Sequence, residues 1–424
     1  MKIAIYIDNR KIDSVDCSDL LKGNPGIGGT EYCVLFLAQM IKEYYPDTQV
    51  SLFVEKSAKL PKVDEIVTVN GLAELAQKVK KNDILVISSR RDGQPLSQNF
   101  FKQLEKENIK TVIWGHNYYY SDYCEQIANC SAIKANVFVG KQQYDRYVDH
   151  SIIEKSTYIY NMYPLVEKKQ RTGRPTHNVT YIGSLVPEKG FQVLASAWKN
   201  ILKKVPDAQL NVIGSGKLYA RDFKLGRYGI AEEKFENEFM THLTDVNGRI
   251  LPSVHFCGVM GAEKDEVILK TGVGVVNPTG RTETFGISAL DFESMGVPVV
   301  TIGKGGFLDT VINNKTGILT QNIADAIVEL LVDEKKNIKY GEQGVKLATN
   351  FSPEIIVKEW MELFNMIILN KTIPYHSPDD FMHVNLKWLR VFNYKLKKTF
   401  NIKNGISVIE IETFARNILR RMGR

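Results

Sequence analysis

Short apolar runs alternate with segments of helical periodicity along most of the chain. The first half contains the runs KIAIYI, VSLFVE, DILVIS, TVIWGHN and NVFVG, and the second half contains NVTYIGS, QLNVIGSG, VHFCG, VGVVNP and VPVVTIG. Continuous apolar runs separated by helical segments are typical of parallel strands buried beneath crossover helices. The pattern therefore predicts an α/β protein with two doubly wound, Rossmann-like domains that face a central cleft.

One break in this pattern divides the chain. Residues 160–178 contain prolines, a glycine and several bases, and the strand-helix alternation begins again after them. A length of 424 residues also exceeds what one core usually supports. Further on, Ser352 and Pro353 mark the start of an amphipathic helix. We predict an N-terminal domain over 1–165, a C-terminal domain over 166–350, a closing helix over 351–370 and a basic helical extension over 371–424.

The net charge of +7 is concentrated in that extension. Residues 386–424 contain ten bases and two acids, a net charge of +8, which leaves −1 for the first 385 residues. Bases confined to a tail argue against nucleic acid as a partner of the main domains. Within the tail, an apolar stripe of helical spacing is flanked by bases and consists of Leu386, Leu389, Phe392, Leu396 and Phe400. Such a helix suits an anionic membrane surface, or it packs on the N-terminal domain with its bases in solvent.

Sequence features that would direct the chain into or across a membrane are missing. No apolar run reaches the roughly 18 residues needed to cross a bilayer, and the N-terminus MKIAIYIDNRK lacks the apolar core and cleavage site of a signal peptide. The cysteines are scattered and never form a C-x-x-C pair, so they predict neither disulfides nor a zinc site. We expect a cytoplasmic protein, peripheral on the inner face of the membrane if the extension binds lipid.

Two acids bracket the segment TETFGISALD, which lies between two predicted strands of the second domain. This position predicts a crossover helix over 285–295, with Glu283 at or just before its first turn and Asp291 two turns later. Eight residues of helix span about 12 Å, roughly the distance from the hexose to the ribose of a nucleotide-sugar. The free N–H groups at a helix start would suit the diphosphate between them. Alternatively, the two acids are a helix-start acid and a solvated one.

Three other stretches carry candidate ligand-binding residues. Gly28 and Gly29 lie in a glycine-rich loop before a helix with Thr30 as the expected N-cap, so backbone N–H groups could approach a phosphate. Lys189 follows a strand and could neutralise a diphosphate. His116 ends a strand and precedes three tyrosines that could stack on a sugar. The alternatives are a surface loop, an exposed lysine, and a structural histidine with packed aromatics.

Taken together, these motifs make the chain resemble glycosyltransferase family 4, whose members are retaining enzymes of the GT-B fold. The resemblance covers about residues 1–370 and rests on GIGGTE, WGHN, YIGSLVPEKG, VIGSGK, VHFCGVM, TETFGISALDFESMGVPVV and GGFLDTVINNKTGIL in this order. It implies transfer of a hexose-type sugar from a nucleotide-sugar, most often UDP-linked, to a saccharide or lipid-linked acceptor. The N-terminal domain would bind the acceptor and the C-terminal domain the donor.

The resemblance also implies roles for individual residues. His116, Glu283 and Lys189 would be catalytic, with His116 on the transferred sugar, Glu283 on its hydroxyls and Lys189 on the diphosphate. Asp291 would hold the ribose hydroxyls. The full set of implied donor-binding residues is Gly28, Gly29, Ser184, Lys189, Glu283, Thr284, Phe285, Gly286 and Asp291.

Two positions depart from the family pattern. Asp291 stands where a glutamate is usual, so the ribose contact is one methylene shorter. Ser184 stands where an arginine is usual, so one of two positive charges on the diphosphate is missing. Arg281 or Arg174 is a possible charge substitute.

Catalysis in this family is understood as positioning and electrostatic stabilisation of the leaving diphosphate rather than covalent chemistry. The chain contains no D-x-D motif, and we expect transfer without a metal or other cofactor. A role in surface polysaccharide or glycolipid assembly would fit the basic extension. The alternatives are a sugar-nucleotide epimerase or phosphorylase of the same fold, or a non-catalytic nucleotide-sugar-binding scaffold or partner subunit.

Overall fold

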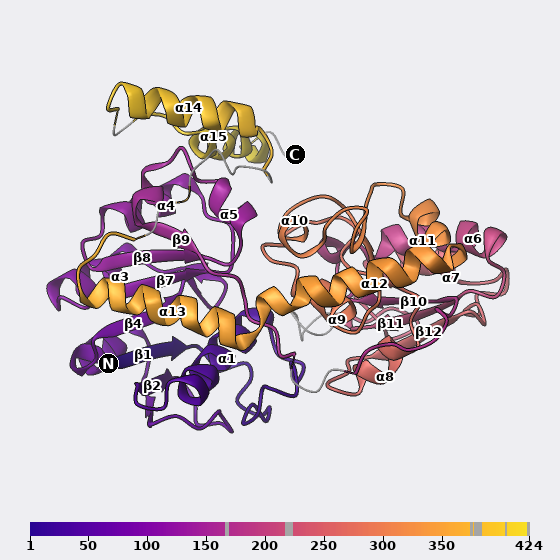
Figure 1. Ribbon diagram of the computed structural model, residues 1–424, viewed down its shortest axis with the longest axis horizontal. Helices are drawn as coiled ribbons and strands as arrows, with labels where there is room; N and C mark the ends of the chain where they lie inside the picture. Colours follow the sequence, from indigo (N-terminus) through magenta and orange to yellow (C-terminus); the bar gives the residue numbers. More distant parts are fainter. Residues whose placement is uncertain (166–168, 217–223, 374–375, 377–383, 403–404, 422–424) are drawn as a thin grey trace. The chain divides into compact units, whose positions relative to one another are not determined.

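The computed structural model describes residues 1–165, 169–216, 224–373, 376, 384–402 and 405–421 (Figure 1). Lys217 of the VIGSGK motif and the bases Lys403 and Arg424 lie outside this set. The chain forms two compact units. Unit 1 comprises Met1–Leu20, Gly29–Met162 and Pro353–Arg424, and unit 2 comprises Leu21–Gly28 and Tyr163–Ser352. In the described part of the chain, no helix combines the length and hydrophobicity needed to cross a bilayer.

Unit 1 is built on a seven-stranded parallel sheet in the order β3-β2-β1-β4-β7-β8-β9. Its strands are β1 Lys2–Ile7, β2 Gln49–Val54, β3 Glu65–Thr68, β4 Ile84–Ser88, β7 Thr111–Gly115, β8 Ile133–Phe138 and β9 Ser156–Tyr158. A small antiparallel hairpin, β5 Arg90–Arg91 and β6 Gln94–Pro95, follows β4. The central strands are almost fully buried, as expected of a parallel sheet covered on both faces.

Helices cover this sheet. They are α1 Gly29–Tyr44, α2 Leu72–Lys78, α3 Gln98–Lys106, α4 Ser121–Asn129, α5 Lys141–Asp145 and α13 Pro353–Ile368. Helix α13 begins at the predicted proline and buries an apolar face that runs from Ile356 to Ile367, and it packs beside α1 (Figure 1). The prediction of Thr30 as N-cap of α1 is wrong, because the helix already begins at Gly29.

Two further helices complete unit 1, α14 Lys387–Thr399 and α15 Val408–Arg421. They contact the region of α4 and α5 (Figure 1). The contact does not use the predicted apolar stripe. Arg390, only 1% exposed, faces the domain instead, while Phe392 and Phe400 face solvent.

Unit 2 contains a six-stranded parallel sheet in the order β12-β11-β10-β13-β14-β15. The strands are β10 Asn178–Ile182, β11 Gln209–Ile213, β12 Val254–Gly258, β13 Val273–Val275, β14 Val299–Thr301 and β15 Gly317–Leu319. The helices are α6 Phe191–Lys204, α7 Glu233–Leu243, α8 Lys264–Leu269, α9 Ile287–Glu293, α10 Phe307–Thr310, α11 Ile323–Val332 and α12 Glu334–Ala348. The predicted fold class of two Rossmann-like α/β domains with a helical C-terminal region is therefore confirmed.

Candidate functional site

The carboxyl ends of β10, β13 and β14 are neighbours in the sheet of unit 2, so the loops that follow them meet at one edge. Gly190 lets the loops after β10 and β13 touch. It has φ +71°, and a Cβ there would lie 2.7 Å from Thr279 Cγ2. The Thr279 hydroxyl in turn donates to the Glu188 carbonyl oxygen at 2.9 Å. This edge is where ligands bind in open α/β sheets.

Lys189 and Glu283 meet at this edge. Lys189 Nζ lies 2.9 Å from Glu283 Oε2, and both side chains are largely shielded from solvent. Tyr181 of β10 holds the lysine backbone by donating its hydroxyl to the Lys189 carbonyl at 2.8 Å. Asn277, which follows β13, donates to the same Glu283 oxygen at 3.3 Å. Two of the predicted catalytic residues are thus brought together, and Asn277 is a neighbour that sequence reasoning missed.

The backbone just before Glu283 is strained. Thr282 has φ +58°, a left-handed conformation that is unfavourable for a β-branched residue. Asn277 also has a positive φ, of 25°, and its side-chain amide donates to the Arg281 carbonyl at 3.0 Å. The loop is thereby held in a conformation that its own residues do not favour, which is common where a side chain must be presented to a ligand.

Two glycines after β14 clamp the same loop from the other side. Gly306 N donates to the Glu283 carbonyl at 3.0 Å. A Cβ at Gly306 would lie 2.2 Å from Phe285 N, and one at Gly305 would lie 2.4 Å from the Glu283 carbonyl oxygen. Gly286, with φ +86°, then directs the chain into α9. The predicted crossover helix between β13 and β14 is present but shorter than 285–295: α9 spans Ile287–Glu293, so Glu283 lies in the clamped loop before it.

Asp291 lies within α9 and is buried. Its Oδ1 accepts a hydrogen bond from the Tyr163 hydroxyl at 2.9 Å and lies 3.0 Å from Lys264 Nζ. Each acid of the pair is therefore matched by its own lysine, Glu283 by Lys189 and Asp291 by Lys264. Lys264 was not foreseen, because its segment carries no distinguishing pattern. Thr284 and Phe285 are buried between the acids, and the Phe285 ring packs against Phe351 at 5.4 Å between centroids.

Ser184 is buried in the loop after β10, and its neutral hydroxyl supplies no charge. Arg281 is exposed in the loop after β13, near Glu283. Lys304 is exposed in the loop after β14, and a Cβ on Gly280 would lie 2.9 Å from the Lys304 Cβ. Arg174 precedes β10 and pairs with Glu334 at 3.5 Å. A strand of five residues spans about 16 Å, which places Arg174 at the opposite edge from Lys189.

The Asn24 side chain bonds to the backbone of the predicted glycine-rich loop. Asn24 Oδ1 accepts hydrogen bonds from Gly26 N and Ile27 N, each at 2.9 Å. Gly28 is the last residue of Leu21–Gly28, the part of this loop that belongs to unit 2. Gly29 is the first residue of α1, which belongs to unit 1.

His116 follows β7 in unit 1 and is almost fully buried. Its ring lies 4.5 Å from that of Trp114, which in turn packs on Trp360 of α13. Burial lowers the pKa of His116 from its usual value to about 3. The imidazole is therefore neutral at physiological pH and can act through hydrogen bonds but not as a cation.

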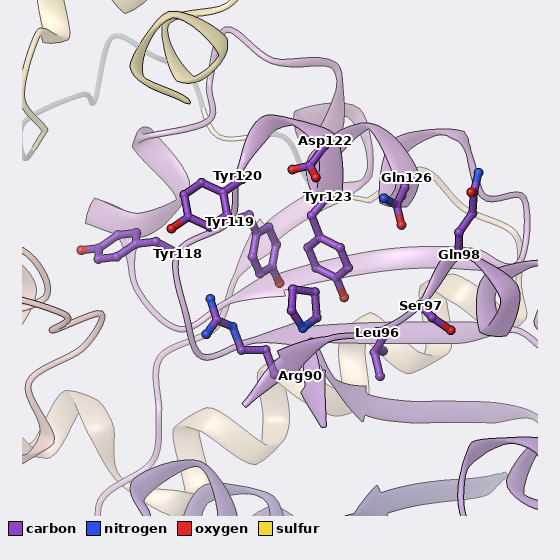
Figure 2. Close-up of a pocket in the computed structure, with 11 residues that line it drawn as sticks. Arg90, Leu96, Ser97, Gln98, Tyr118, Tyr119, Tyr120, Asp122, Tyr123 and Gln126 are labelled. Atoms are coloured by element: carbon purple, nitrogen blue, oxygen red, sulfur yellow. The ribbon is translucent and has the colours of Figure 1, made fainter. Parts of the chain in front are cut away.

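The tyrosines after His116 line a pocket of about 210 Å³ in unit 1. Tyr119 and Tyr123 are buried, with Tyr123 donating to the Ser89 carbonyl at 2.8 Å, whereas Tyr118 and Tyr120 are half-exposed. Figure 2 shows the four tyrosines along one side of the pocket and Arg90 across from them. Aromatic faces beside a cation, a carboxylate (Asp122) and amides suit a polar, ring-shaped ligand such as a saccharide.

Among the described residues, no group of three or more histidine, cysteine, aspartate or glutamate side chains is arranged to hold a metal ion.

Solved structures with the same architecture identify the fold. Anabaena HepE, in complex with UDP and glucose, superposes with a TM-score of 0.61 at 14% identity, covering 86% of this chain and 99% of HepE. The chain has the GT-B fold. A family model described as glycosyl transferases group 1 matches residues 176–333 of this GT-B chain, which include Lys189, Glu283 and Asp291.

Curated relatives of the GT-B chain are glycosyltransferases. A GDP-mannose-dependent α-(1-6)-phosphatidylinositol monomannoside mannosyltransferase of Mycobacterium tuberculosis is 30% identical over 202 residues, 43% of this chain and 46% of the relative. The capsular polysaccharide biosynthesis glycosyltransferase CapM of Staphylococcus aureus is 28% identical over 211 residues, 48% of this chain and 50% of the relative. The chain thus matches about half the length of these relatives.

Proposed function

We propose that this GT-B chain is a retaining glycosyltransferase that moves a hexose from a UDP-sugar to an acceptor in surface polysaccharide or glycolipid assembly. The Lys189–Glu283 pair carries the proposal. It lies at the carboxyl edge of the sheet, inside the region matched by the glycosyltransferase family model, on a loop that two glycines clamp from behind. Glycosyltransferase relatives named for phosphatidylinositol mannoside and capsule synthesis support the acceptor class.

In the proposed donor complex, Glu283 accepts hydrogen bonds from the hexose hydroxyls and the buried backbone at Phe285 and Gly286 lies against sugar and phosphate. Asp291 holds the ribose. In the described part of the chain, the Tyr163 hydroxyl and the Lys264 ammonium group both contact Oδ1 of Asp291, so Oδ2 is the oxygen proposed for the ribose hydroxyls. Lys264 and Tyr163 fix the shorter aspartate in place.

The second positive charge for the diphosphate comes from the loops after β13 and β14. Arg281 is exposed there and its side chain has no ion pair with any described residue, and Lys304 is next to it across Gly280. Arg174 is a poor substitute because it lies at the other end of β10 and already pairs with Glu334. We therefore assign the role of the missing Ser184 charge to Arg281, with Lys304 as its neighbour.

The transfer step needs no covalent enzyme intermediate. The bond between the anomeric carbon and the diphosphate oxygen breaks, the acceptor oxygen bonds to the same face of that carbon, and the acceptor proton passes to the leaving diphosphate. Lys189 and Arg281 stabilise the charge that develops on the diphosphate. The neutral His116 holds the transferred sugar by hydrogen bonding. No step in this scheme uses a metal, and activity should persist in EDTA.

The acceptor is assigned to the tyrosine pocket of unit 1. Tyr118 and Tyr120 would stack on a sugar ring while Arg90 and Asp122 bond its hydroxyls. Tyr120→Ala should raise the KM for a saccharide acceptor about tenfold and leave hydrolysis of the donor alone unchanged. Tyr44→Ala is the control, since Tyr44 is an exposed tyrosine on α1 that does not line the pocket. Equal acceptor kinetics in both variants would remove the pocket from the proposal.

The deciding experiment is a donor panel. The purified protein is incubated with UDP-, GDP- and ADP-hexoses, and nucleotide binding and release are followed. Release from one donor should be lost in Glu283→Gln and kept in Glu188→Gln, the same chemical change at an exposed acid of the neighbouring loop. Binding without release in the presence of acceptors would favour the non-catalytic scaffold, and binding of no donor would refute the proposal.

A further inference from the structure

Exposed apolar side chains gather on the two C-terminal helices. Of the nineteen large hydrophobic residues exposed in the described part of the chain, ten lie between residues 386 and 418. We call them the extension surface: Leu386, Trp388, Phe392, Leu396, Phe400, Ile402, Ile406, Ile411, Phe414 and Ile418. On α14 they recur every four residues and on α15 every three or four, so each helix presents an apolar stripe. A cluster of this kind on a folded protein marks an interaction surface.

The stripes are exposed although both helices are firmly attached to unit 1. Arg390 donates to the Arg146 carbonyl and to Glu412, and it lies 3.7 Å from Asp149. Asp149 in turn accepts from the Asn393 side chain at 2.8 Å and from Val408 N at 2.7 Å. Helix α14 therefore packs with Arg390 inward and its aromatic side outward, the reverse of an ordinary surface helix, while α15 is anchored by the buried Val408 and Ile409 at its start.

The charges on these helices distinguish between possible partners. Both acids of the two helices bind partners within the protein. Glu412 pairs with Arg390 and Arg146, and Glu410 accepts a hydrogen bond from Ser407. The exposed charged residues described on α14 and α15 are all basic: Lys387, Lys395, Lys398 and Arg416. Two copies of this surface would bring like charges together, whereas an anionic lipid headgroup layer complements the bases and accepts the apolar side chains.

We infer that the extension surface docks the protein on an anionic phospholipid bilayer, with Trp388, Phe392 and Phe400 at the boundary between headgroups and acyl chains. The docking helices also touch the tyrosine pocket. Arg416 donates to the Tyr120 hydroxyl at 3.1 Å, and its guanidinium lies over the Tyr120 ring. Lipid docking would thus hold the proposed acceptor pocket near the membrane, although docking itself does not depend on the proposed activity.

Trp388 gives a direct test. It is 70% exposed, while the other three tryptophans of the chain are at most 1% exposed. Vesicles of phosphatidylcholine with phosphatidylglycerol should shift its emission to shorter wavelength, and brominated lipid should quench it. The signal should be absent in Trp388→Phe and much weaker with phosphatidylcholine alone, and Lys395→Glu/Lys398→Glu should weaken binding further.

Matched variants keep the reporter in place. Phe392→Ser/Phe400→Ser should lower partitioning into vesicles about tenfold or more, while Ile66→Ser, at an exposed position of β3 in the same unit, should leave it unchanged. The inference is overturned if anionic vesicles neither shift nor quench Trp388, or if neutral vesicles bind equally well. A lipid-free blue shift that grows with protein concentration, together with a dimeric mass, would assign the surface to a second copy instead.

Discussion

The clamp on the Glu283 loop can be tested by adding one methyl group. In Gly306→Ala the new Cβ would lie 2.2 Å from Phe285 N, 2.3 Å from its Cα and 2.5 Å from its carbonyl carbon. All three are backbone atoms, so no side-chain rotation relieves the overlap, and the two loops must separate by about 1 Å. Overpacking of this kind costs up to about 3 kcal/mol, and weakening the Gly306 N–H bond to the Glu283 carbonyl adds about 1 kcal/mol.

Gly303→Ala is the control within the same loop, because its Cβ would meet nothing closer than 3.6 Å. For a unit of this size, 3 kcal/mol corresponds to a fall in Tm of about 6–12 °C. Calorimetry measures that fall, and hydrogen exchange in β13 and β14 shows whether it belongs to unit 2. Donor affinity should fall with it, because the loop that carries Glu283 is displaced. If the two variants melt within about 2 °C of each other, the clamp has no energetic importance.

Three other outcomes are expected. Lys189→Met should lower kcat/KM by about 10²–10³-fold with little change in Tm, and an equal loss in Lys270→Met, an exposed lysine, would contradict a specific role. The pH profile of kcat/KM between pH 5 and 8 should keep its shape in His116→Gln, because the pKa of His116 is lowered to about 3 by burial; an inflection near pH 6.5 that vanishes in the variant would show that the imidazole titrates. Burial raises the pKa of Glu293 in the folded state well above its usual range. The contribution of the protonated carboxyl group to the free energy of unfolding is therefore complete below about pH 4.5 and is lost as pH rises toward the folded-state pKa. Glu293→Gln should therefore gain stability relative to the natural protein as pH rises from 5 to 8, and parallel stability curves in denaturant would contradict this.

The strands that sequence predicts best are those with a complete apolar run. KIAIYI is β1 and VHFCG is β12 in full. Three edge or near-edge strands were missed: β3, whose residues alternate between half-exposed and exposed, β9 and β15. These strands have three or four residues, too few to show a period, and they are formed by pairing with a neighbour that the sequence does not reveal.

Local patterns placed Lys189 after a strand, His116 at a strand end and Glu283 at or just before a helix start, but could not describe their surroundings. That Lys189 pairs with Glu283 depends on three loops from distant parts of the chain meeting at one edge. Lys264, which neutralises Asp291, lies on a separate helix with no recognisable motif. The apolar stripe of the tail was predicted, but the sequence left open whether it faces outward or toward the N-terminal domain, because burial of Arg390 depends on Glu412 and Asp149, far from it in sequence.

In the proposed site, the two lysine–acid pairs limit the positive charge that is available to a donor diphosphate. Lys189 and Glu283 together contribute no net charge, and neither do Lys264 and Asp291. A diphosphate that binds Lys189 therefore competes with Glu283 for the same ammonium group, and the neutral Ser184 adds no positive charge. Arg281 and Lys304 are the cations on the adjoining loops that are not matched by an acid of the pair. In the proposed site, Lys189 serves both Glu283 and the diphosphate, and Arg281 with its neighbour Lys304 adds the positive charge that an arginine at 184 would supply. Removing Arg281 should weaken UDP and UDP-sugar equally, whereas removing the Glu283 carboxylate should weaken only the sugar-bearing ligand.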